Sequence, residues 1–192
     1  MKYLYILLPI SFFLFFAGCP RKEDSRSTEI PTEKVAVKET VNLELDSKIT
    51  DEHFKEGMDV SSLSMVSLKT GEVVSLGSFK GKKIVIDFWA SWCAPCIGMF
   101  PVFNELKRKM EDEAGKVKVV SINLDPLPAK AKKIMKNEGA EFEVLKAPES
   151  LINAGILMPF TVIADENGTV FVNTSGVHTY EELLNMIEGE KD

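Results

Sequence analysis

The pattern of apolar and polar positions divides the chain into three zones. Residues 3–17 are uncharged and mainly apolar, and residues 20–46 are rich in charged and hydroxyl side chains with no clear period. From about residue 62 onward, short extended runs alternate with segments of helical period. This change predicts a leading apolar segment, a polar connection and one folded domain.

Short extended runs predict the strands of a sheet. Residues 64–68 and 73–76 flank a Lys-Thr-Gly turn and predict a β-hairpin. The β-branched run 83–89 predicts a central strand that is buried on both faces. Further strands are expected at residues 117–124, 160–164 and 169–173.

Segments of helical period lie between these strands. Residues 95–113 have apolar side chains three and four apart, and Pro101 is expected to kink this helix without ending it. A Lys-rich helix is predicted at 128–137, where the lysines form either a solvated face or a docking patch for an acidic partner. Thr179 is expected to cap a last helix that ends near residue 188. This order predicts an α/β fold with a mixed central sheet flanked by helices.

The first eighteen residues have the layout of an export signal, with Lys2 before an apolar stretch. This stretch is shorter than the roughly 20 residues that a membrane-spanning helix needs. It ends in Phe16-Ala17-Gly18-Cys19, which resembles the lipobox of bacterial lipoproteins. We expect residues 1–18 to be a lipoprotein-type signal peptide and Cys19 to be the lipidated N-terminus. The alternative is an uncleaved signal anchor. Both interpretations tether the rest of the chain to a membrane outside the cytoplasm.

Residues 19–50 are expected to form the lipidated N-terminus and a flexible tether. The polar part of this segment contains no aromatic residue and cannot bury enough apolar surface to offset the entropy of ordering. A short helix capped by Thr50 is expected where the domain begins. We expect residues 51–192 to form a single domain.

The composition excludes some classes of protein. The chain has 192 residues, with 23 Lys and Arg against 29 Asp and Glu, and a formal net charge of −6. A nucleic-acid-binding protein needs an excess of basic side chains to neutralise phosphates, so we expect no nucleic-acid partner. Three Cys are too few for a disulfide-scaffolded fold.

Cys93-Ala94-Pro95-Cys96 lies between the predicted central strand and the long helix. Three kinds of site have two Cys at this spacing. A zinc site needs four ligands, but there is no second Cys pair, and His53 and His178 are isolated. A structural disulfide over so short a loop would constrain little unfolded-chain entropy. The position therefore favours a redox-active dithiol and no metal.

The start of a helix also favours the thiolate, which is the nucleophile in disulfide exchange. The helix dipole contributes about 0.3–1 kcal/mol, which is less than one pKa unit, so hydrogen bonds must supply the rest. Asp87 lies within the predicted buried strand, where burial raises the pKa of a carboxyl group. Such a group can exchange a proton with Cys96 through a water molecule. The alternative is an Asp87 that faces solvent or pairs with a Lys.

The segment from Asp87 to Cys96, with Pro101 five residues later, resembles the thioredoxin superfamily. Residues 68–76 and 79–82 resemble its TlpA/ResA-like branch of membrane-tethered proteins, as do residues 158–168. The resemblance covers about residues 62–187. It implies a thioredoxin-like three-layer sandwich with an N-terminal β-hairpin extension.

The resemblance also implies roles for individual residues. Cys93 would be the attacking sulfur, and Cys96 would resolve the mixed disulfide. Pro159 matches the proline that the family keeps in cis beside the dithiol. The backbone of Met158 would pair with an extended substrate segment, and Trp92 would belong to the docking surface.

The function implied is a membrane-anchored, extracytoplasmic (periplasmic) thiol–disulfide oxidoreductase that reduces the disulfides of envelope proteins. A membrane electron donor would recharge it, because the sequence has no flavin or nicotinamide motif and we expect no cofactor. Its task would be cytochrome c maturation or envelope thiol homeostasis. Met99 argues against the first, because several family members in that pathway have Glu there. A disulfide oxidase or isomerase and a non-catalytic polypeptide-binding module are the alternatives.

Overall fold

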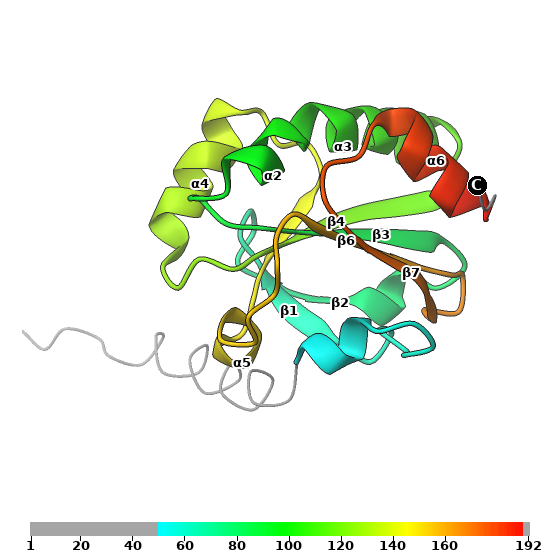
Figure 1. The fold of residues 1–192 in the computed structure, drawn as a ribbon, viewed down its shortest axis with the longest axis horizontal. Coiled ribbons are helices and arrows are strands. Elements are labelled where there is room, and N and C mark those ends of the chain that lie inside the picture. The colour runs from blue at the N-terminus through cyan, green and yellow to red at the C-terminus, as the bar shows by residue number, and fades with distance from the viewer. Residues whose placement is uncertain (1–49, 190–192) are drawn as a thin grey trace, which may run out of the picture.

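The computed structural model describes residues 50–189, which form a seven-stranded sheet in the order β2-β1-β5-β4-β3-β6-β7 (Figure 1). The predictions for the signal peptide, Cys19 and nearly all of the tether lie outside the described residues. The strands are β1 (Ser64–Ser67), β2 (Val73–Ser75), β3 (Lys83–Trp89), β4 (Val117–Asn123), β5 (Glu143–Lys146), β6 (Phe160–Ala164) and β7 (Val170–Ser175).

The sheet is parallel in its centre and antiparallel towards both edges. Strands β3, β4 and β5 are parallel, whereas β1 pairs antiparallel with β5 and β6 pairs antiparallel with β3. The hairpin partners β2 and β7 form the two edges. Every residue of β3 after Lys83 is buried, as expected for a strand with neighbours on both sides and layers on both faces.

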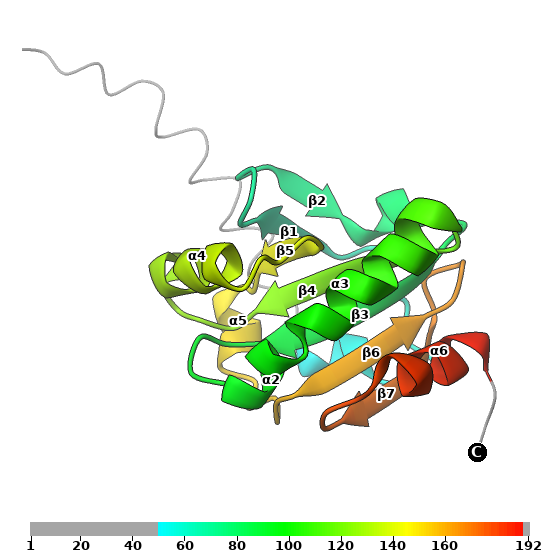
Figure 2. The same ribbon diagram turned by 90° about the horizontal axis from the view of Figure 1, so that it is seen from above.

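The longer helices cover one face of the sheet (Figures 1 and 2). They are α2 (Ala94–Gly98), α3 (Phe100–Leu106), the π-helix η3 (Lys107–Glu113), α4 (Pro128–Asn137) and α6 (Tyr180–Glu188). The other face is covered by shorter elements, which are the 3₁₀ helices η1 (Asp51–Phe54) and η2 (Leu76–Phe79) and the helix α5 (Glu149–Ile152). Two helical layers with the sheet between them make a thioredoxin-like three-layer sandwich, which confirms the predicted fold class.

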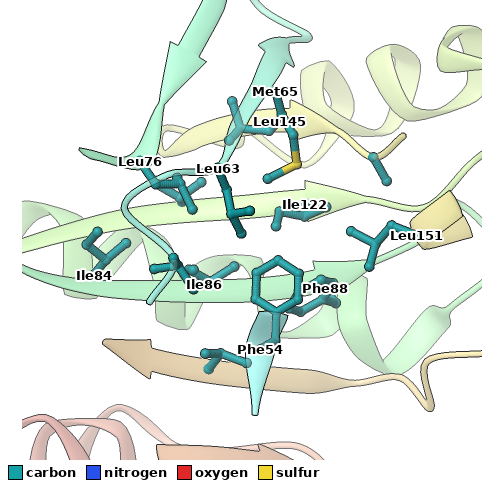
Figure 3. Close-up of a cluster of buried hydrophobic side chains, with 14 of the residues drawn as sticks. Phe54, Leu63, Met65, Leu76, Ile84, Ile86, Phe88, Ile122, Leu145 and Leu151 are labelled. Carbon is teal, nitrogen blue, oxygen red and sulfur yellow. The ribbon is translucent and has the colours of Figure 1, made fainter. Parts of the chain in front are cut away.

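Alternation along the strands sends side chains into two separate cores. Even-numbered residues of β3, such as Ile86 and Phe88, pack with Phe54, Leu63 and other side chains on the face of the short helices (Figure 3). The rings of Phe54 and Phe88 meet edge to face with centroids 4.9 Å apart. Odd-numbered residues of β3 instead face α2, α3 and α6. The core under the long helices therefore contains the dithiol.

The long helix predicted at residues 95–113 is divided in the structure. Met99 separates α2 from α3, and the last two turns form the π-helix η3. Pro101 has no N–H to bond to the carbonyl four residues earlier, so the regular ladder breaks here. The backbone of Met99 stays in the right-handed helical region, with φ −84° and ψ −10°. The expected kink is present, but the prediction of one continuous α-helix is wrong.

The sequence did not predict β5, α5 or η2. Strand β5 has only four residues, Glu143–Lys146, and its two end residues are polar. Periodicity over so short a run does not distinguish a strand from a loop. The hairpin, the central strand and the helix at 128–137 were predicted in their correct places.

A strap formed by residues 57–60 joins the start of β7. The N–H of Gly57 donates to the carbonyl of Val170, and the N–H of Val60 donates to the carbonyl of Gly168. Gly168 has φ +96°, and an added Cβ would lie 2.9 Å from the Cβ of Ser61. Glycine is needed here both for its backbone conformation and for the close approach of the strap.

We predict that Gly168→Ala destabilises the protein more than Gly71→Ala. Both glycines have positive φ, but no atom lies near the position of a Cβ on Gly71. The Gly71 variant should lose about 1 kcal/mol from backbone strain, and the Gly168 variant about 1–3 kcal/mol more from overpacking. Urea unfolding measures both values. Equal losses would show that the strap yields easily at Gly168.

Candidate active site

Cys93 and Cys96 form a disulfide directly after β3, at the start of α2. Their Cα atoms are 5.4 Å apart. Cys93 is 5% exposed, whereas Cys96 is completely buried. Of the two Cys in the disulfide, only Cys93 therefore has any solvent-accessible surface.

The turn between β3 and α2 is built by local hydrogen bonds. The N–H of Cys93 donates to the carbonyl of Ala90 at 2.9 Å, and the N–H of Ile97 donates to the carbonyl of Cys93 at 3.2 Å. Pro95 occupies the first turn of α2, where the missing N–H breaks no helical hydrogen bond. The two Cys are thus held three residues apart on one tight turn.

Asp125, two residues after the end of β4, fixes this turn, and the sequence analysis did not identify it. Its carboxylate accepts hydrogen bonds from the backbone N–H of Ser91 at 2.9 Å and from the Ser91 hydroxyl at 2.8 Å. The side-chain amide of Asn123 donates to the same carboxylate at 2.9 Å. The available signal was an acidic residue just after a predicted strand that runs parallel to the dithiol strand.

Asp87 lies in the middle of β3 and is completely buried. It shares its face of the strand with Val85 and Trp89, which pack in the same core as Cys96. Loss of hydration raises the pKa of the Asp87 carboxyl well above its ordinary value. The alternatives of a solvent-facing or Lys-paired Asp87 do not fit this geometry.

Polar side chains flank Asp87 on both neighbouring strands. Ser121 of β4 and Thr161 of β6 stand opposite Asp87 in the register of the sheet. The hydroxyl of Ser121 accepts a hydrogen bond from the indole N–H of Trp89 at 3.1 Å. The side-chain oxygens of Asp87 and Thr161 have no hydrogen-bond partner within residues 50–189. A polar row therefore crosses the sheet beneath the long helices.

The loop before β6 reaches the same end of the sheet. The Met158–Pro159 peptide bond is cis, as the family resemblance implied. Met158 packs against both cores, one of which contains Cys93 and Cys96. The carbonyl of Pro159 accepts a hydrogen bond from the N–H of Gly176 at 2.9 Å, which ties this loop to the one after β7. The structure thus brings Met158 to the core that contains the dithiol and places Pro159 at the same end of the sheet.

The structure places Trp92 at the surface beside Cys93, with 72% of its area exposed. Trp89, by contrast, is buried against the ring of Phe100. Within the described part of the chain, no group of three or more His, Cys, Asp or Glu side chains could hold a metal ion. The ring of His53 accepts a hydrogen bond from the backbone N–H of Thr50 and so caps η1.

Comparison with known proteins agrees with this geometry. Residues 55–184 match the family model described as Redoxin. The chain belongs to the Redoxin family. The TlpA/ResA-like assignment within the thioredoxin superfamily rests on the relatives and solved structures that follow.

Three similar proteins illustrate this assignment. The thiol-disulfide oxidoreductase ResA of Bacillus thuringiensis subsp. konkukian is 27% identical over 136 residues, which are 69% of this chain and 77% of ResA. The thioredoxin-like protein YneN of Bacillus subtilis is 30% identical over 67% of this chain and 76% of its own. A putative thiol:disulfide interchange protein DsbE from Chlorobium tepidum is 31% identical, with a TM-score of 0.61 over 70% of this chain and 96% of the DsbE chain.

These relatives and the Cys93–Cys96 pair identify the chain as a TlpA/ResA-like thiol–disulfide oxidoreductase with a thioredoxin-like fold. Family members of this kind act on disulfide-containing proteins.

We predict that Asp87→Asn stabilises the oxidised protein at neutral pH but not near pH 4. Because the folded-state pKa of Asp87 is raised, its carboxyl favours folding fully only below the ordinary pKa of 3.8. In the wild-type protein, the contribution of Asp87 to the free energy of unfolding is lost as the pH rises towards its folded-state pKa. An Asn side chain does not titrate, so the variant has no such dependence. Urea unfolding from pH 4 to pH 8 measures the difference, and a constant difference would contradict the prediction.

Asp59→Asn provides a control of opposite sign. Hydrogen bonds from Ser61 lower the pKa of the Asp59 carboxyl. Its contribution to stability is therefore present above the ordinary pKa and is lost as the pH falls. Relative to wild type, this variant should lose stability at neutral pH and recover it in acid.

We predict that Asp125→Ala costs about 1–3 kcal/mol of stability, because the backbone N–H of Ser91 and the side-chain amide of Asn123 would lose the carboxylate oxygen that accepts from both. Ser91→Ala removes a single hydroxyl donor and should cost about 1 kcal/mol. Chemical denaturation of both oxidised variants measures these losses. If the two variants are equally stable, Asp125 does not hold the turn.

Proposed function

We propose that this protein is a membrane-anchored, extracytoplasmic reductant of protein disulfides. The observation that carries the proposal is the placement of the dithiol. Cys93 keeps a small exposed fraction of 5% next to the exposed Trp92, whereas Cys96 is completely buried on the face of the sheet that holds Asp87. This separates an attacking sulfur from a resolving sulfur and supplies the latter with a proton acceptor.

The reaction begins when the Cys93 thiolate attacks one sulfur of a client disulfide. A mixed disulfide forms, and the other client sulfur leaves as a thiolate that takes a proton from solvent. The Cys96 thiolate then attacks the Cys93 sulfur and releases the second client thiolate. Two electrons have passed to the client, and the protein is left with the Cys93–Cys96 disulfide.

Asp87 acts on the second step. The thiol of Cys96 is buried and must lose its proton before it can attack. A carboxyl group whose pKa is raised by burial accepts a proton near neutral pH more readily than an exposed one. Asp87 therefore takes the Cys96 proton through a water molecule and returns it when the dithiol is regenerated.

The client binds next to the cis-proline loop. Within residues 50–189, no hydrogen bond involves the backbone of Met158, so its N–H and C=O are available to an extended segment. Such pairing adds a strand-like partner through main-chain hydrogen bonds. The exposed indole of Trp92, which directly precedes Cys93, supplies apolar contact.

Attachment to the membrane rests on the sequence. Lys2, the apolar stretch and the lipobox-like residues before Cys19 support export and lipidation of Cys19, with residues 19–50 as the tether. Within residues 50–189, no helix is long and apolar enough to cross a bilayer. The protein would act at the periplasmic face on disulfide-containing envelope proteins.

Each cycle requires a membrane electron donor that reduces the Cys93–Cys96 disulfide, because two electrons leave with every client. Met99 is buried in the helical core and supplies no acid near the dithiol. This favours general envelope thiol homeostasis over dedicated cytochrome c maturation.

We predict that the Cys93–Cys96 couple has a reduction potential below about −200 mV, as expected for a reductant. Equilibration of the protein with glutathione or dithiothreitol mixtures measures it. A value near −120 mV would instead indicate an oxidase.

We also predict that Cys96→Ser accumulates mixed disulfides with client proteins in membranes, because the resolving sulfur is missing. Cys93→Ser, which keeps only the buried Cys, is the matched control and should trap none. Wild-type protein should also reduce insulin in the presence of dithiothreitol. A chain that traps no client and does not reduce insulin would be a binding module.

A further inference from the structure

Exposed apolar side chains gather at the end of the sheet that holds the dithiol. Six large apolar side chains are exposed among the described residues, at Met58, Val73, Trp92, Leu127, Leu157 and Val177. Trp92 follows β3, Leu127 follows β4, Leu157 precedes β6 and Val177 follows β7. The register of these strands puts all four loops at one end of the sheet. Exposed apolar surface concentrated in one place indicates an interaction site.

A groove lies on one side of this end, between the turn before Cys93 and helix α4. We call it the α4 groove; its volume is about 720 Å³, and its lining includes Trp92, Leu127, Ala129, Lys130, Lys133 and Ile134. Both views show α2 and α4 at the same end of the sheet (Figures 1 and 2). This volume suits a few side chains of a bound polypeptide.

Helix α4 gives this groove a positive rim. The helix has four lysines and no acidic residue, although the whole chain has a net charge of −6. Lys130 and Lys133 line the groove, whereas Lys132 and Lys136 do not. All four are exposed, and within residues 50–189 none of them forms an ion pair or hydrogen bond. Their charges are therefore available to a partner.

The acidic residue in the groove does not neutralise this rim. Asp125 is nearly buried, and its carboxylate accepts three hydrogen bonds from Ser91 and Asn123. These bonds hold it towards the turn. The exposed charges of the groove are the two lysines.

We propose that the α4 groove binds an acidic segment of the client protein, with a large apolar side chain of the client against Trp92 and Leu127 and carboxylates at Lys130 and Lys133. The inference rests on the proposed function and deepens it, because the groove begins at Ser91 and Trp92, directly before Cys93. A segment docked there presents a neighbouring disulfide to Cys93, the less buried of the two Cys. The protein would thus select disulfides that have acidic and apolar neighbours.

The test compares two disulfide-containing peptides that differ only in having two Glu or two Gln beside a Leu that flanks the disulfide. Single-turnover reduction by the full-length dithiol protein is measured at low and high salt. At low salt the Glu peptide should react about fivefold faster than the Gln peptide, which corresponds to two exposed ion pairs, and high salt should remove the difference. Reduction of both peptides at the same measurable rate at low salt would overturn the proposal.

Two double variants locate the effect. K130E/K133E should abolish or reverse the preference for the Glu peptide, and K132E/K136E should retain it within about twofold. The two variants make the same charge change on the same helix, so an equal loss in both would indicate general charge attraction and would overturn a specific groove.

A binding measurement that involves no disulfide exchange separates this proposal from the proposed function. A Cys-free version of the Glu peptide is titrated into the oxidised protein, and the fluorescence of exposed Trp92 is followed, with Trp92→Phe to subtract buried Trp89. Saturable binding that K130E/K133E weakens at least fivefold supports the groove, whether or not the disulfide peptides are reduced. If neither disulfide peptide is reduced, the proposed function as a reductant is refuted, and the groove is not. A titration without any change would refute the groove.

Discussion

Pairing of β3 on both sides is the constraint on which the site depends. From Lys83 to Trp89 the strand pairs with β4, and from Ile84 to Phe88 it also pairs with β6. These ladders fix which side chains point to each face, since a slip of one residue would exchange the two faces. The same register puts Asp87 beneath the long helices and delivers Cys93 to the end of the sheet.

The burial of Asp87 lowers the stability of the folded protein, but it gives the carboxyl group a pKa that suits proton exchange with a buried thiol. An ionised carboxylate without a partner destabilises a core, so the protonated form is favoured in the folded protein. A site selected only for stability would have an apolar residue at this position. Its raised pKa instead makes the ionised carboxylate a strong acceptor for the proton of a buried thiol, whereas Asp125, with its hydrogen bonds from Ser91 and Asn123, holds the turn.

Much of the fold and of the site could be predicted because the decisive residues are neighbours in the sequence. Asp87, Cys93 and Cys96 lie on one strand–turn–helix unit, whose strand pattern and Cys spacing are local. Asp125 and Thr161 come to the site only through pairing of distant strands, which a linear pattern does not display. Strand β5 was missed for the same reason, because its four residues become a strand only between β4 and the hairpin. The division of the long helix depends on one missing N–H at Pro101.

The strap at residues 57–60 has a consequence for the sheet as a whole. It is hydrogen-bonded to the start of β7 at one edge, and the chain then crosses under the sheet to enter β1 and the hairpin near the other edge. Edge strands are the parts of a sheet that separate most easily and that pair with foreign chains. Here neither edge can peel away without pulling on a segment anchored at the opposite border, so the domain favours cooperative over piecemeal opening.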